Sequence, residues 1–364
     1  MSLSLIDRIY ECSFFPDLWP GVLTEIAQMG RASGGVLFAA NPSADILRWT
    51  SSETVRPEMT DYVADGWLMK GGRLGRTLAA QHAGFLTELD IFTDDELAED
   101  PLYRDFLRPK GWGWCAGTAV MLPTNDVLIM TIERRLADGP VEAEAVQMLD
   151  GLRPHLGRSA LMAARLQMER AQTAANTLGL LGLPAVVLDS RGRALAANRQ
   201  IEDLQSHVRW RAKDQMALKD PAAERLLQTA LARTAADDNR AAQSFAVRGA
   251  EEEVSMVAHL VPVRGSANDI FARSAAILML TPVTLPHAPP VELVQSLFDL
   301  TAAEAGVARS LAAGDSLQDI AVTRKVSHGT VRTQMRSILE KTGCHRQAEV
   351  VALLSGVTAA PGAG

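Results

Sequence analysis

The sequence predicts an α+β chain: two mixed helix-and-sheet domains joined by a long helix, then an all-α domain of four short helices. Strand-like runs alternate with helical segments before and after a long helical stretch, and the last part of the chain carries helix-start and helix-stop signals without strand patterning. We expect the boundaries at 1–140, 141–175, 176–285 and 286–364.

The composition and net charge limit the classes to which this protein can belong. The chain has 364 residues, of which 47% are apolar and 22% charged, so it is long enough for two or three folded domains. Its net charge of −7 excludes a uniformly basic nucleic-acid binder but allows a local basic patch. The three cysteines, Cys12, Cys115 and Cys344, are few and far apart, which argues against a disulfide framework or a cysteine-based zinc site.

No segment has the pattern of a targeting signal or a membrane span. The first residues lack the basic flank and apolar core of a signal peptide. The longest apolar run, Leu178–Leu188, is too short for a span and contains Pro184. We therefore expect a cytoplasmic protein that does not bind membranes.

The first domain is predicted from helices and strands in alternation. Residues 4–30 form two helices separated by "FFPDLWP", and Gly34–Asn41 is a strand that pairs with the run at 44–51. The segment Trp114–Arg135 contains two strand-like runs around a predicted turn at Pro123–Asp126.

A long helix is expected from Pro140 to about Asn176, and Pro154 should kink or split it. Apolar residues with a spacing of three and four lie at Leu149, Leu152, Leu156, Ala163 and Leu166. Ser159 interrupts this stripe. Two interpretations stay open: the helix packs on its own domain, or it pairs with its copy in a dimer.

The second domain begins with a predicted hairpin at Pro184–Asn198, followed by helical material to about Arg233. Further strands are expected near Gln243–Arg248, Val254–Val263 and Ala275–Leu280. A hairpin, then helices, then three strands is the order of a PAS domain, which this region resembles, and the first domain resembles a PAS or GAF relative. The segment Thr281–Pro290, with four prolines, is predicted to be a linker.

The C-terminal domain is divided by its own capping residues. Thr301 and Glu304 predict a capping box, so a helix should start at Ala302 and end at Gly314. Ser316 caps a short second helix. A third helix should run from Ser327 to Gly343, and a fourth should begin near Arg346. Four short helices in this length favour a helix-turn-helix.

The third helix separates an apolar face from a cationic one. Its apolar arc contains Val331, Met335, Ile338, Leu339 and Thr342. Residues 324–346 hold six Lys or Arg against one acid, Glu340, a local charge of about +5. Such a helix fits the major groove of DNA. The alternative is an ordinary solvated face of a helical bundle.

These residues resemble the LuxR-type helix-turn-helix, also found in NarL-like response regulators. The pattern "LT-x-x-E … L-A-x-G-x-S-x-x-x-I-A … V-S-x-x-T-V-R … I-L-x-K-T-G … R-Q-A-E-x-V" is present without gaps. The resemblance implies base contacts by Arg332, Thr333 and Arg336. It implies phosphate contacts by Thr330 and Lys341. Lys325 and Ser327 complete the predicted DNA-binding set. Gln334 stands where many members have His, so the operator sequence is not predicted.

The N-terminal regions fit no phosphorylated receiver and contain no Walker sequence. An acyl-homoserine-lactone sensor is only partly matched. Some of its typical residues are present at Asp100-Pro101, Tyr62 and Trp67, but its full pattern is not. Four tryptophans of the first domain are candidates to wall a ligand cavity, with ordinary core packing as the alternative. They are Trp49, Trp67, Trp112 and Trp114.

We do not expect an enzyme. Cys115, between bulky aromatics and without a nearby histidine in sequence, is predicted to be a buried core cysteine rather than a nucleophile. The seven histidines show no metal-ligand spacing. His207 is predicted to be an ordinary histidine rather than a haem ligand, and we expect no cofactor.

The sequence therefore predicts a homodimeric, sequence-specific transcriptional regulator that binds a double-stranded DNA operator. Its N-terminal domains would sense a small molecule or a protein partner, and RNA polymerase is a further expected partner. One alternative is a protein-interaction sensor with weak or conditional DNA binding. Another is an enzyme with a vestigial DNA-binding domain.

Overall fold

The computed structural model describes residues 3–41, 46–122, 126–236, 241–249, 255–263, 269–283 and 288–357. The chain divides into two compact units, which are described separately. The first comprises Met1–Ala174, Val187–Ser190 and Pro262–Ala276, and the second comprises the rest. Mixed helix and sheet followed by a purely helical C-terminal region confirms the predicted fold class.

The first unit is built on a five-stranded antiparallel sheet with the order β2-β1-β5-β4-β3. Its strands are β1 (Gly34–Asn41), β2 (Ile46–Ser51), β3 (Leu86–Thr87), β4 (Trp112–Met121) and β5 (Val127–Arg135). The predicted pairings of β1 with β2 and of β4 with β5 are confirmed. Of the turn predicted at 123–126, residues 123–125 lie outside the described part of the chain.

Both faces of this sheet are buried, because successive side chains along its strands belong to two different hydrophobic clusters. On β1, Leu37 belongs to one hydrophobic cluster and its neighbour Phe38 to another. On β5, Met130 and Ile129 divide in the same way. Because successive side chains of a strand point to opposite faces, the two clusters lie on opposite sides of the sheet.

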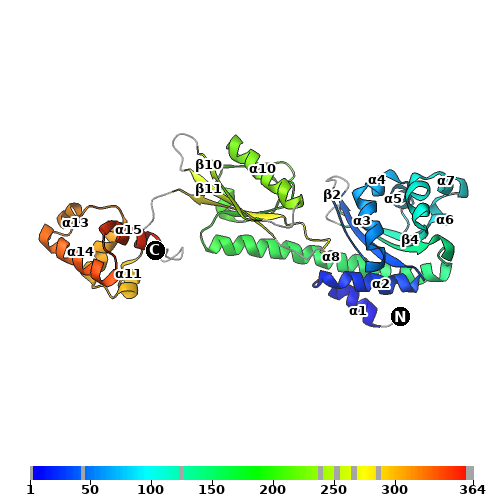
Figure 1. The fold of residues 1–364 in the computed structure, drawn as a ribbon, viewed down its shortest axis with the longest axis horizontal. Helices are drawn as coiled ribbons and strands as arrows, with labels where there is room; N and C mark the ends of the chain where they lie inside the picture. Colours follow the sequence, from blue (N-terminus) through cyan, green and yellow to red (C-terminus); the bar gives the residue numbers. More distant parts are fainter. Residues whose placement is uncertain are drawn as a thin grey trace. The chain divides into compact units, whose positions relative to one another are not determined.

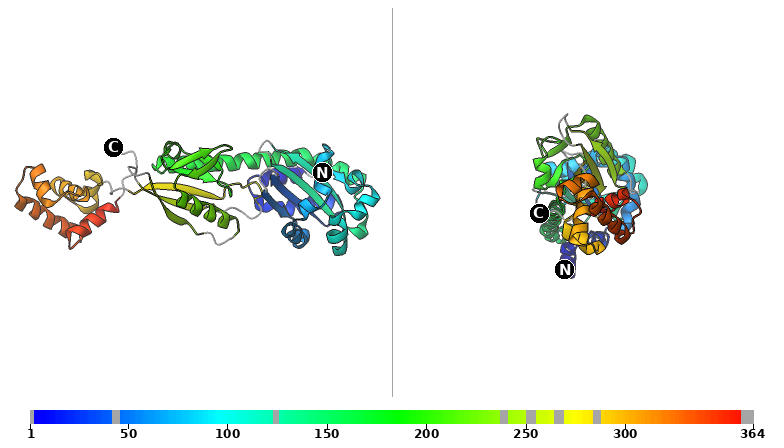
Figure 2. Two further views of the ribbon diagram at one scale, coloured as in Figure 1. Left: turned by 90° about the horizontal axis from the view of Figure 1, so that it is seen from above. Right: turned by 90° about the vertical axis from the view of Figure 1, so that its left-hand side faces the viewer.

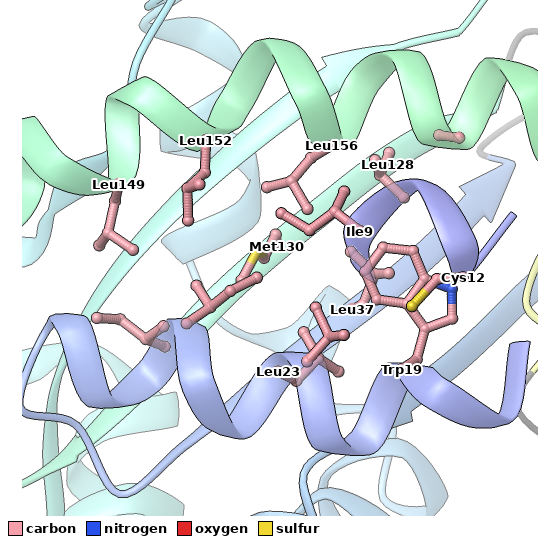
Figure 3. Packing of buried hydrophobic residues seen from close by; sticks show 14 of the residues in the cluster. Ile9, Cys12, Trp19, Leu23, Leu37, Leu128, Met130, Leu149, Leu152 and Leu156 are labelled. Atoms are coloured by element: carbon pink, nitrogen blue, oxygen red, sulfur yellow. The ribbon is translucent and has the colours of Figure 1, made fainter. Parts of the chain in front are cut away.

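One face is covered by α1 (Leu3–Glu11), α2 (Trp19–Met29) and the long helix α8 (Ala143–Leu180). Figure 3 shows Leu149, Leu152 and Leu156 pointing from α8 into the cluster that contains Leu23 and Met130. The three leucines are at most 1% exposed. The predicted stripe therefore packs within its own domain, which favours the first of the two interpretations of this helix.

The helix α8 continues through Pro154 without a break (Figure 1 and Figure 2), so the prediction that Pro154 splits it is wrong. An internal proline costs about 3 kcal/mol, and burial of a leucine stabilises by roughly 1.5–3 kcal/mol. Leucines on both sides of Pro154 offset that cost. Ser159, which interrupts the stripe, is buried and donates a hydrogen bond to the carbonyl of Ile9 at 2.6 Å.

Short helical segments form the cluster on the opposite face of the sheet. They are η2 (Glu53–Val55), α3 (Arg56–Ala64), α4 (Trp67–Lys70), α5 (Arg73–Ala79), α6 (Glu88–Ile91), α7 (Asp94–Glu99), η3 (Leu102–Leu107) and η4 (Arg108–Lys110). Two further turns, η1 (Pro16–Leu18) and η5 (Leu136–Asp138), precede α2 and follow β5.

A second five-stranded sheet has the order β10-β11-β12-β6-β7. Its strands are β6 (Ala185–Leu188), β7 (Ala194–Ala197), β10 (Gln243–Val247), β11 (Met256–Pro262) and β12 (Ala276–Pro282). All five strands were predicted. Read from β7, this order matches that of the first sheet read from β2: second, first, fifth, fourth, third. The helices of this region are α9 (Arg199–Asp203) and α10 (Pro221–Ala236).

The prediction of helical material up to Arg233 is wrong between α9 and α10. There β8 (Val208–Arg211) and β9 (Gln215–Leu218) form a two-stranded antiparallel sheet. Their loop places Lys213 and Asp214 at positive φ, 62° and 57°. Hairpin turns of this kind usually carry Gly or Asn, so the sequence gives no turn signal here.

The C-terminal region contains α11 (Val291–Phe298), α12 (Ala302–Ala312), α13 (Leu317–Thr323), α14 (His328–Thr342) and α15 (Gln347–Ser355) around one hydrophobic cluster. The last four are the predicted helices, while α11 is an additional one. Its Val294 is fully buried. In the part of the chain that the structure describes, no helix is both long enough and apolar enough to cross a bilayer.

Candidate nucleic-acid interface

Side-chain caps set the boundaries of the three helices α12, α13 and α14. The hydroxyls of Thr301, Ser316 and Ser327 accept hydrogen bonds from backbone N–H groups three residues later, at 3.1–3.3 Å. Gly314 follows α12 with φ 99°, and Gly343 ends α14 with φ 71°. Every predicted cap of these helices is confirmed, and the helix boundaries follow from local sequence.

The connection between α13 and α14 is a tight turn. Lys325 adopts φ 55°, and the amide of Val326 donates to the carbonyl of Ala321 at 3.0 Å. A left-handed conformation is unfavourable for a residue with a side chain. This turn places the exposed Lys325 just before the first turn of α14.

The two faces of α14 are divided as the sequence predicts. Val331 and Ile338 are fully buried and Met335 is 6% exposed, whereas Arg332 and Arg336 are exposed. The apolar face packs against α12, α13 and α15. The domain core therefore fixes the helix and leaves its cationic face outward.

All seven predicted DNA-binding residues are exposed, but they differ in their contacts. Thr333 donates to the carbonyl of Gly329 within the helix at 3.1 Å. The hydroxyls of Ser327 and Thr330 lie 2.8 Å apart, which holds both at the start of α14. Contact with DNA by any of the seven remains a prediction.

Lys341 is engaged inside the domain. Its Nζ lies 2.8 Å from a carboxylate oxygen of Glu304, which is 8% exposed. The carboxylate also accepts hydrogen bonds from the hydroxyl of Ser337 at 2.7 Å and the amide of Thr301 at 2.7 Å. Lys341, with Ser337 and Thr301, lowers the pKa of Glu304 to about 2.

Glu304 therefore has two roles, of which the sequence showed only one. It closes the capping box of α12 and also binds α14 through Lys341 and Ser337. The second role depends on the packing of two helices, so no local pattern indicates it.

Among the described residues, three cations that have no partner within the domain lie at the turn before α14 and on α14 itself. Arg324 donates to the carbonyl of Ala303 at 3.1 Å, and Lys341 is paired with Glu304. Within the described ranges, Lys325, Arg332 and Arg336 have no ion pair or side-chain hydrogen bond. Exposed cations at one turn and on the following helix can meet phosphates and base edges of a duplex.

The two residues that could have served as a nucleophile or a haem ligand lie outside this helical domain. Cys115 is a buried core cysteine, as predicted, and burial raises the pKa of its thiol well above the ordinary value. His207 is also buried, with Nδ1 2.9 Å from the Ser206 hydroxyl. Among the described residues, no group of three His, Cys, Asp or Glu side chains could hold a metal ion.

Comparison with known proteins gives a family match to the helical domain. Residues 299–354 match the family described as bacterial regulatory proteins, luxR family. No curated protein sequence matches the chain at a significant level.

Several solved structures resemble the chain weakly. SdiA of Escherichia coli is 12% identical over 92% of this chain and 87% of its own, with a TM-score of 0.31. CepR2 of Burkholderia cenocepacia, an N-acylhomoserine lactone dependent LuxR family factor, is 13% identical over 44% of this chain and 95% of its own, with a TM-score of 0.33. At such TM-scores they establish neither a common fold nor a common ligand. The family match covers the capped helices α12 to α15, and residues 299–354 form a helix-turn-helix domain of the luxR family of bacterial regulatory proteins.

Proposed function

We propose that the protein is a sequence-specific DNA-binding transcriptional regulator that acts as a homodimer in the cytoplasm. The observation that supports this best is the outward cationic face of α14 within a luxR-family domain, with Arg332 and Arg336 exposed and without protein partners among the described residues. In this proposal Arg332, Thr333 and Arg336 contact bases. Lys325, Ser327, Thr330 and Lys341 contact phosphates, and Lys341 would have to leave Glu304 to do so.

We further propose that the regions before residue 285 sense a small molecule or a protein partner. The two sheets share one strand order, with a hairpin followed by helices and three more strands, which supports PAS- or GAF-like domains at 1–140 and 176–285. The boundaries of the linker at 141–175 and of the DNA-binding domain at 286–364 belong to the same proposal. RNA polymerase would be the partner through which the DNA-bound dimer acts.

The small area over which one helix can contact DNA supports dimerisation. One recognition helix contacts only a few base pairs, and two copies on half-sites about one helical turn apart bind far more strongly because the second contact is intramolecular. The helix α8 offers exposed apolar residues on a face that its own domain does not cover. They are Met148, Leu161, Met162 and Met168, 41–53% exposed.

Selection from a pool of random double-stranded DNA with the full chain tests the proposal. We expect enrichment of a sequence with two related half-sites separated by about ten base pairs. Enrichment of a single half-site would refute the dimeric mode. Recovery of no common sequence at moderate salt would favour the protein-interaction alternative.

A further inference from the structure

A narrow cavity lies inside the first unit, between the sheet and the segments α3 to α6 and η3. Its volume is ≈ 30 Å³. The wall is mainly apolar and includes the buried side chains of Phe38, Met59, Tyr62, Leu107 and Ile129. Ligand sites typically combine such walls with a few polar groups.

The four tryptophans of the first domain do not line this cavity. Trp112 is buried in the same core, and Trp49, Trp67 and Trp114 pack against it. The scattered lactone-sensor residues are not assembled here either. Only Tyr62 lines the cavity, while the carboxylate of Asp100 accepts hydrogen bonds from the amides of Gly72 and Leu102.

Alternate residues of β5 line the cavity, and two of the three are polar. Ile129, Thr131 and Glu133 all line it, as the period of two in a strand requires. On the neighbouring strand β4, Gly117 pairs with Thr131 and Cys115 with Glu133. A side chain at Gly117 would meet the Thr131 methyl group at 3.0 Å, so the glycine keeps this part of the cavity open.

Arg73 of α5 is the basic residue of the cavity. It is 9% exposed, and its Nη1 lies 3.0 Å and 3.3 Å from the two carboxylate oxygens of Glu133. Its Nε donates to the Tyr103 hydroxyl at 2.9 Å, which in turn donates to Glu88 at 2.9 Å. Glu88 is 1% exposed and lies 3.8 Å from Arg73 Nη2, beyond hydrogen-bond distance.

Two buried polar atoms at this cavity have no hydrogen-bond partner: Nη2 of Arg73 and Oγ1 of Thr131. Thr131 is 6% exposed. Leaving a buried donor unsatisfied costs about 1–3 kcal/mol, more for a charged group. A guanidinium nitrogen can only donate. A bound molecule with an acceptor oxygen would satisfy it and recover that energy.

The charges around Arg73 limit what this acceptor can be. Glu133 already balances the guanidinium, and Glu88 adds a second carboxyl group. Burial raises the pKa of Glu88, with Arg73 as the opposing influence. Whether Glu88 is ionised or protonated, the cluster carries no net positive charge. A ligand carboxylate would bring an uncompensated anion into a buried site, and a ligand ammonium has no acceptor atom for the free guanidinium nitrogen.

We propose that this cavity binds an uncharged small molecule whose carbonyl or hydroxyl oxygen accepts hydrogen bonds from Arg73 and Thr131 and whose apolar part lies against Phe38, Met59 and Ile129. The empty volume accommodates only one or two water molecules. Binding of a longer ligand requires the half-buried side chains of Leu68, Leu74 and Ile91 to move. That such a molecule controls DNA binding rests on the proposed function.

Three six-carbon compounds with different head groups test the head-group requirement on the full chain: hexanamide, hexanoate and hexylamine. We expect calorimetric titration to show that hexanamide binds at least about tenfold more tightly than either charged compound. Tenfold in affinity corresponds to a difference of about 1.4 kcal/mol in binding free energy. Failure of hexanamide to bind, or equal binding of hexanoate or hexylamine, would overturn the proposal.

The variant Thr131→Val keeps the shape of the side chain and removes its hydroxyl. It should weaken hexanamide binding about threefold to tenfold, as expected for one neutral hydrogen bond. Thr24→Val is the matched control, because Thr24 bonds the carbonyl of Pro20 on α2 and does not line the cavity. Unchanged hexanamide affinity in Thr131→Val would contradict the assigned contact.

The same protein samples separate this inference from the proposed function. If the full chain binds its selected DNA but not hexanamide, the cavity proposal fails and the DNA-binding proposal stands. If hexanamide binds with the expected preference but selection returns no common DNA sequence, the cavity proposal stands and the DNA-binding proposal fails.

Discussion

Lys341 on α14 and Glu304 at the start of α12 form an ion pair of 2.8 Å that joins α14 to α12, the first of the three capped helices. Ser337, one turn before Lys341, donates to the same carboxylate at 2.7 Å. One carboxylate therefore fixes two successive turns of α14. The orientation of the exposed arginines depends on this contact as well as on the apolar core.

The Glu304 carboxylate should make stability depend on pH. Its pKa in the folded chain is about 2, below the ordinary value, so it binds fewer protons folded than unfolded near pH 3–4. Its stabilising contribution is fully present above about pH 5 and is lost as the pH falls towards 2. Thermal unfolding of the wild type and of Glu304→Gln between pH 7 and pH 3 measures this. We expect the wild type to be more stable at pH 7 and the difference to shrink as the pH falls. A difference independent of pH would refute the assignment.

Arg332→Ala and Arg336→Ala should each cost about 1–3 kcal/mol of binding to the selected DNA and relax its sequence preference, because each is proposed to read a base edge. Fluorescence anisotropy with the selected and a scrambled duplex measures both effects. Arg309→Ala is the control, since Arg309 is an exposed cation on α12 rather than on α14. Wild-type preference in both variants would show that the interface lies elsewhere.

Lys341→Ala should weaken binding to all DNA sequences about equally if Lys341 contacts phosphate. It should also lower the stability of the domain, because it leaves the nearly buried Glu304 without its cation. Affinity and melting temperature should be measured on the same preparation. A loss of stability with no loss of affinity would restrict Lys341 to the ion pair.

Leu152→Ala should destabilise the full chain by about 2–5 kcal/mol, because Leu152 is fully buried in the core of the first unit. Gln147→Ala on the same helix is the control: Gln147 is exposed, and its change should stay within about 0.5 kcal/mol. Urea unfolding of both variants provides the measurement. Similar effects of the two would contradict the assigned buried face of α8.

Sedimentation should find a dimer of the full chain at micromolar concentration and a monomer of the fragment 286–364. In the fragment, the hydrophobic residues Val350 and Leu354 of α15 are buried in the domain's own core, so they are not available for contact with a second copy. Replacing Leu161 and Met168 together by serine should weaken the dimer if the exposed face of α8 forms it. A full-length monomer, or a tight dimer of the fragment, would each contradict this assembly.

The helix-turn-helix could be predicted from sequence because its signals are local. Thr301, Ser316 and Ser327 start helices, and Gly343 stops one, within a few residues of the backbone groups they satisfy. The hairpin of β8 and β9 could not, because its turn uses Lys213 rather than Gly at positive φ.

The polar residues that line the cavity could not be predicted either, for a different reason. Thr131 and Glu133 occupy alternate positions of a strand that is otherwise apolar up to Ile132, a signal that the sequence does contain. Their meaning depends on Arg73, which lies 60 residues before Glu133 and reaches it only through the fold. Such a pairing has no periodicity along the chain, so pattern alone cannot reveal it.

The unbroken course of α8 past Pro154 has a consequence for helical phase. Each residue of an α-helix adds a rotation of about 100° and a rise of about 1.5 Å. Residues between Ala163 and Ala171, two buried positions of this helix, include the exposed Arg165 and Met168. One residue inserted there would rotate the rest of the helix by about 100° relative to its beginning, whereas seven would restore the rotation to within about 20°. The tolerance of this segment to insertion should therefore follow the period of the helix rather than the number of residues added.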